Sequence, residues 1–62
     1  MNRRQFLKYL AGHNCYEDHE GTLHTIVKNF SNGCTSALPR HRELKRGTVR
    51  AICKDLEIPP PF

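Results

Sequence analysis

Residues 21–28 read Gly-Thr-Leu-His-Thr-Ile-Val-Lys, a β-prone run that decides how the rest of the chain must fold. Side chains alternate between the two faces of a strand. One face of this strand carries Thr22, His24, Ile26 and Lys28, and the other carries Leu23, Thr25 and Val27. We expect the second face to meet a core and the strand to run from Thr22 to about Phe30. An exposed imidazole exchanges protons near neutral pH, so His24 is a candidate reactive group.

A hairpin should follow this strand, because Asn32-Gly33 is the strongest short-range turn signal. A two-residue turn there pairs Ser31 with Cys34. The same register sets Lys28 opposite Ala37 and His24 opposite His41. Pro39 has no N–H to donate to a ladder, so the third strand should end at it.

Two amphipathic helices flank the strands. The first should span Arg3 to Ala11, with Asn2 and Gln5 as a capping box and Gly12 as its stop. The second should begin between Arg46 and a possible cap at Thr48, and end by Glu57. Its apolar stripe is Val49, Ile52, Cys53 and Leu56. A short first strand falls within residues 15–19, where we expect Tyr16 to pack.

The predicted order is helix, three strands, helix, which defines an α+β fold. The antiparallel sheet should be covered on one face by both helices, leaving the face with His24 and Lys28 exposed. Residues 1–58 form a single domain, and residues 59–62 are expected to be a loose proline-rich tail.

The charge distribution indicates a polyanionic partner. The 62-residue chain has a net charge of +4. Between residues 40 and 54 there are six basic side chains and one acid, Glu43. Nucleic acid is the simplest partner, and a solvated helix surface is the alternative. The acidic cluster of Glu17, Asp18 and Glu20 should weaken the attraction to a polyanion on one side.

The three cysteines form no CxxC pair, and we expect reduced, part-buried thiols. Cys15 and His19 lack the second pair of ligands that a metal site needs, so neither metal nor cofactor is predicted. No apolar run reaches membrane-spanning length, and the N-terminus lacks a secretory apolar region. A cytoplasmic location away from membranes is expected.

Four landmarks in order carry a family resemblance: the opening helix and the segments 21–24, 39–41 and 43–52. Over residues 1 to about 58, the sequence resembles HicA-type mRNA interferase toxins of bacterial toxin–antitoxin systems. The resemblance implies a fold like the double-stranded RNA-binding domain, mRNA as substrate and a cognate HicB-type antitoxin.

It also implies ribonuclease activity that depends on a histidine following a Gly-Ser pair. Gly21-Thr22 corresponds to that pair, with threonine keeping the hydroxyl. Leu23 occupies the nearer of the two positions where the family places its histidine, so the role transfers to His24 alone.

The predicted site therefore has His24 as general acid or base. The residues expected to contact RNA are Gly21, Thr22, Lys28, Arg40, His41, Arg46 and Arg50. Gly21 would allow close approach to RNA or supply a positive φ angle. Lys28, and Arg40 or His41 if the register holds, would stabilise charge on the phosphate. For His41, an ordinary turn residue is an equal alternative.

Two other functions are open at this level. A non-catalytic module would bind duplex RNA by its shape, in a salt-sensitive way and without cleavage. A protein-interaction domain would present its basic face to an acidic partner and have negligible RNA affinity.

Overall fold

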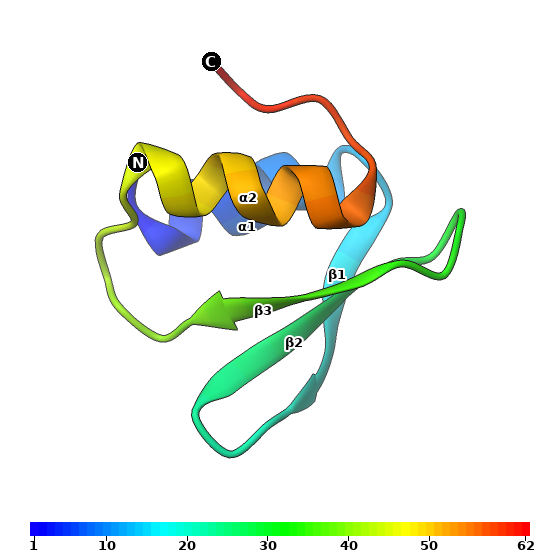
Figure 1. Ribbon diagram of the computed structural model, residues 1–62, viewed down its shortest axis with the longest axis horizontal. Helices are drawn as coiled ribbons and strands as arrows, with labels where there is room; N and C mark the ends of the chain where they lie inside the picture. The colour runs from blue at the N-terminus through cyan, green and yellow to red at the C-terminus, as the bar shows by residue number, and fades with distance from the viewer.

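The computed structural model describes all 62 residues and has the predicted order of elements. The elements are α1 (Arg3–Ala11), β1 (Cys15–Glu20), β2 (His24–Asn29), β3 (Thr35–Pro39) and α2 (Arg46–Leu56). The three strands form one antiparallel sheet with β2 in the centre. Both helices lie on the same face of the sheet (Figure 1), which confirms the α+β, double-stranded-RNA-binding-domain-like arrangement. None of its helices is long and apolar enough to cross a bilayer.

The core lies between the helices and one face of the sheet. The predicted stripe of α2, from Val49 to Leu56, is buried in it. From β2, the core side carries Thr25 and Val27, as the alternation predicted. The expectation for Leu23 is wrong: its side chain is 75% exposed, because β2 begins only at His24 and Leu23 belongs to the preceding turn.

The capping box of α1 is present as predicted, with Asn2 and Gln5 each satisfying the other's backbone N–H. The start of α2 differs from the Thr48 alternative. This helix begins at Arg46 after Lys45, which makes no side-chain capping bond, so Thr48 lies inside the first turn. Glu57 then ends α2 in the left-handed conformation, with φ 58°.

The predicted register of the β2–β3 hairpin is wrong by two residues. Asn29 pairs with Cys34, because the Asn29 N–H donates to the Cys34 carbonyl at 2.8 Å. The loop is therefore 30–33, and it closes with Gly33 at φ +82°. His24 consequently lies opposite Pro39, not opposite His41. A shift of two keeps every side chain on its predicted face.

Asn29 explains the longer loop. Its buried side chain donates to the Leu56 carbonyl at 2.9 Å and accepts the Ser31 N–H at 2.9 Å. The bond to Leu56 ties the end of β2 to the end of α2, and the bond from Ser31 holds the start of the loop. The hairpin therefore turns where this long-range contact fixes it, and Asn32-Gly33 serves as the second half of a longer loop.

The C-terminal tail, expected to be loose, lies back over the helices (Figure 1). The Tyr9 hydroxyl donates to the Pro59 carbonyl, and the Arg46 guanidinium lies 4.6 Å from the centre of the Phe62 ring. The tail therefore contacts the helical layer, on the side away from the sheet.

Candidate functional site

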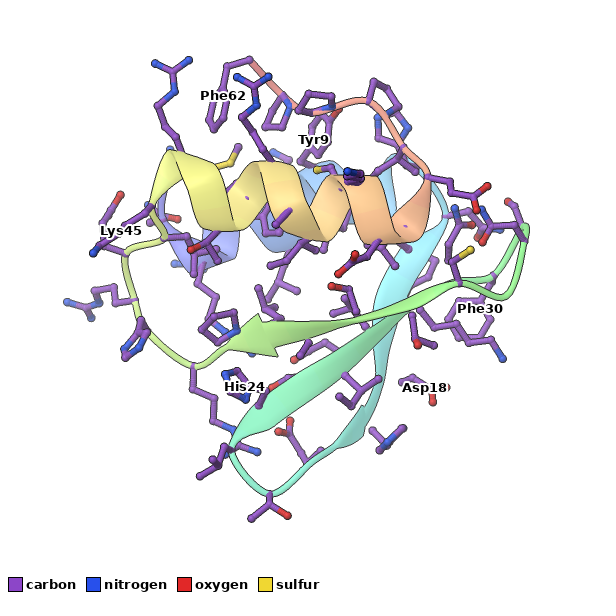
Figure 2. All side chains as sticks on the ribbon, in the orientation of Figure 1. Tyr9, Asp18, His24, Phe30, Lys45 and Phe62 are labelled. Carbon is purple, nitrogen blue, oxygen red and sulfur yellow. The ribbon has the colours of Figure 1, made fainter.

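His24 is the first residue of β2 and points to the uncovered face of the sheet, which we call the outer face. Its neighbour Thr25 is buried on the core side, so alternation sends the imidazole outward, where it is exposed. The side chain makes no hydrogen bond within the protein, so both ring nitrogens are free for a ligand. Figure 2 shows it near the end of the sheet, away from the hairpin that carries Phe30.

The turn before His24 is tight. The Gly21 N–H donates to the His24 carbonyl at 2.8 Å. A Cβ atom on Gly21 would lie 2.9 Å from that same oxygen, closer than real side chains come. Glycine is required here for close approach within the chain, and the predicted positive φ is absent. The position of His24 thus depends on Gly21.

Arg40 holds the same turn from the end of β3. Its guanidinium donates to Glu20 Oε1 at 2.7 Å and to the Gly21 carbonyl at 2.8 Å, with a longer contact to the Thr22 carbonyl at 3.4 Å. The Arg40 hydrogen bond, and after it that of Thr25, holds the pKa of Glu20 below its usual range. Arg40 was predicted to meet a phosphate, but its donors are largely used to fix the turn that carries His24.

Thr22 lies in this turn, two residues before His24, and its side chain is exposed. Its carbonyl is held by Arg40, so its hydroxyl is the group left to face a ligand. Gly21 and Thr22 therefore both lie in the turn that leads into His24.

Lys28 shares the outer face with His24 but lies four residues along β2. At about 3.3 Å per residue, the two α-carbons are roughly 13 Å apart. The Lys28 ammonium lies 5.4 Å from the centre of the Phe30 ring. Lys28 and His24 therefore lie apart on the outer face, and the Lys28 side chain extends toward Phe30.

The structure does not gather the remaining predicted RNA-binding residues around His24. His41 follows β3 in an exposed loop and lines a cavity with Pro39, Lys45 and Thr48. Arg46 and Arg50 are exposed on α2. Because α2 covers the core face of the sheet, these two arginines lie in the helical layer, on the other side of the sheet from His24.

Tyr16 and Phe30 are two outer-face residues that the sequence reasoning missed. Tyr16 was expected to pack but is 48% exposed, and Phe30 is 51% exposed. Their ring centres are 6.1 Å apart. The period-two alternation that selected His24 and Lys28 also reaches Phe30, and this signal could have found it.

The cysteines are free thiols, as predicted, with Cys15 and Cys53 buried and Cys34 partly buried. Burial raises the pKa of all three thiols, and for Cys34 a hydrogen bond to Glu57 adds to the effect. They are therefore protonated and poorly nucleophilic at neutral pH. No three potential metal-ligating side chains lie close together.

These observations define a small α+β domain of the double-stranded-RNA-binding type, with an exposed histidine at the entry to its central strand. The chain belongs to the HicA toxin family. Residues 3–58 match the family model that is described as "HicA toxin of bacterial toxin-antitoxin". It is thus the toxin component of a toxin–antitoxin system. No curated protein and no solved structure gives a significant match.

Proposed function

We propose that this toxin is an mRNA interferase, a metal-independent RNA endonuclease that uses His24 as its general acid or base. The exposed, unpartnered imidazole of His24, held at the Gly21 turn of a HicA-family chain, is the observation that supports this function. Arg40 supports it as a positioning residue, because it fixes the turn from the other side.

The reaction is an internal transfer. The RNA 2′-oxygen attacks the adjacent phosphorus, the bond from phosphorus to the 5′-oxygen breaks, and the products are a 2′,3′-cyclic phosphate and a 5′-hydroxyl. Neutral His24 would take the 2′-hydroxyl proton, or protonated His24 would give a proton to the leaving 5′-oxygen. Either role contributes roughly 10²–10⁴-fold to the rate.

The other predicted RNA contacts divide into three groups. Gly21 and Thr22 lie beside His24 and would contact the nucleotide being cleaved. Lys28 would bind a phosphate further along the outer face. The third group, His41, Arg46 and Arg50, would meet RNA beyond the sheet or a different surface of a folded RNA.

The test compares wild type with His24→Ala on a long RNA in EDTA, with both proteins free of any partner. A matched control is His19→Ala, since His19 is also an exposed histidine of this sheet but is bonded to Asp18 at 2.8 Å. We expect cleavage to fall about 10²–10⁴-fold with His24→Ala and to be retained with His19→Ala. Circular dichroism should show all three folded.

Cleavage by the folded His24→Ala protein at the wild-type rate would contradict the proposal, as would 3′-hydroxyl product ends. Intact RNA in every lane, together with salt-sensitive binding to duplex RNA, would instead favour the non-catalytic module that the fold also suits.

We further propose that a cognate HicB-type antitoxin silences the toxin in the cytoplasm by covering His24. The exposed position of His24 supports this, because any protein seated over the turn would keep RNA from the imidazole. Adding the purified antitoxin should abolish cleavage, and Leu23→Asp, at the 75% exposed position beside His24, should weaken that inhibition. Inhibition unchanged by this charge would place the antitoxin elsewhere.

A further inference from the structure

We propose that Tyr16, Lys28 and Phe30 form a base-stacking subsite for single-stranded RNA on the outer face of the sheet. This inference rests on the proposed function and names the form of its substrate. The subsite would hold nucleotides a few positions away from the phosphate at His24.

The three side chains share one surface with His24. Through β2 and into the first residue after it, alternation carries the outer-face row from His24 through Ile26 and Lys28 to Phe30. Tyr16 lies opposite Lys28 in β1. The Phe30 N–H donates to the Asn14 carbonyl at 2.9 Å, so the backbone at Phe30 continues the pairing of β1 with β2. Both rings therefore project from backbone that is hydrogen-bonded between neighbouring segments of the sheet.

The Tyr16 and Phe30 rings do not contribute to the hydrophobic core. Neither belongs to the buried cluster between sheet and helices, and each leaves about half of its surface in water. Their centres lie 6.1 Å apart with the planes inclined by 53°, so the two rings are not stacked face to face on each other. Exposed aromatic rings on a sheet are the usual platform on which single-stranded bases stack.

Lys28 adds a positive charge to the two rings, and we call Tyr16, Lys28 and Phe30 together the platform. The Lys28 ammonium lies over the Phe30 ring, 5.4 Å from the ring centre, so a cation and two aromatic rings share one small surface that would meet the phosphate and base of a nucleotide together. In β1, the carboxylate of Asp18 lies 2.8 Å from Nδ1 of His19 and is paired with that ring. A polyanion with flat, apolar bases fits this combination of rings and cation.

The distance between the platform and His24 determines which form of RNA can contact both. Phe30 lies six positions after His24, roughly 20 Å away at about 3.3 Å per residue, and Figure 2 shows the two near opposite ends of the sheet. An RNA strand spanning both must be extended with its bases unpaired, because a duplex hides the base faces within its stack. The platform therefore selects single-stranded over duplex RNA.

Binding is measured in a His24→Ala background, so that RNA stays intact. The probes are a fluorescein-labelled single-stranded RNA and a hairpin duplex of the same composition, followed by anisotropy in EDTA. Phe30→Ala is expected to weaken single-strand binding about tenfold and leave duplex binding unchanged. Its matched control is Phe62→Ala, because Phe62 is also an exposed ring beneath a cation, Arg46, but lies over the helices.

Two further variants separate stacking from charge. Phe30→Trp should preserve affinity, and the only tryptophan in the chain should lose fluorescence when bases stack on it. Lys28→Ala should lower the slope of log affinity against log salt by about 0.7, whereas Phe30→Ala should leave that slope unchanged. Phe30→Leu, which keeps an apolar side chain without a flat ring, should weaken binding like alanine.

The proposal is overturned if folded Phe30→Ala and Phe30→Leu bind the single strand as tightly as the parent, or if Phe30→Ala weakens duplex binding equally. It is also overturned if these variants weaken only the antitoxin complex, which would make the face a protein-docking surface. If instead the proposed function is wrong, wild type will not cleave RNA. Phe30→Ala would still weaken single-strand binding in that case, so the two failures can be distinguished.

Discussion

Replacing Gly21 with alanine should loosen the turn that carries His24. The added Cβ would lie 2.9 Å from the His24 carbonyl oxygen, whereas ordinary contacts begin near 3.4 Å. Backbone atoms must therefore move apart by about 0.5 Å, since neither partner is a flexible side chain. The 2.8 Å hydrogen bond from Gly21 to His24 is weakened by the same movement.

We expect this change to cost about 1 kcal/mol in free energy of unfolding, the usual net value of one hydrogen bond. A misplacement of 1 Å can cost about 100-fold in rate, so half of that predicts roughly tenfold slower RNA cleavage. Urea unfolding followed by circular dichroism measures the first quantity, and a gel-based cleavage rate measures the second.

Gly47→Ala is the matched control, because a Cβ at this helical position meets nothing within 4 Å. Alanine is the better helix former, so this variant should gain about 0.5–1 kcal/mol. If Gly21→Ala unfolds and cleaves like wild type, or if Gly47→Ala loses as much stability, the close approach at Gly21 does not fix His24.

Three other predictions concern stability. Asn2→Ala removes the capping box and should cost about 1 kcal/mol in urea unfolding. Leu38→Ala, at a fully buried position, should lower the free energy of unfolding by about 2–5 kcal/mol. Leu23→Ala, at an exposed position, should change it by no more than about 0.5 kcal/mol. Equal losses of stability would contradict the assignment of Leu23 to the turn. The pKa of Glu20 is lower in the folded protein than its ordinary 4.5, so its contribution to stability is complete above about pH 4.5 and is lost as the pH falls through the lower folded value. Glu20→Gln should therefore lower the melting temperature at pH 7 and reduce its fall toward pH 3, and an unchanged acid profile would count against the Arg40 contact.

The sequence alone determined the order of the elements and the faces of most of their residues, although Leu23 and Tyr16 were wrongly expected to pack. The capping box at Asn2, the stripe from Val49 to Leu56 and the outward direction of His24 were all read correctly. Each depends on residues close together in the chain, through helix ends or through the periods of 3.6 and 2.

The tertiary structure alone decided which residues meet. Asn29 reaches the end of α2 and lengthens the hairpin, so Pro39 faces His24 and His41 does not. Arg40 meets Glu20 across the sheet and fixes the His24 turn. Local periodicity determines the face of the sheet on which a side chain lies. The residue that it contacts there depends on interactions between segments far apart in sequence, and these cannot be derived from a short stretch of the chain.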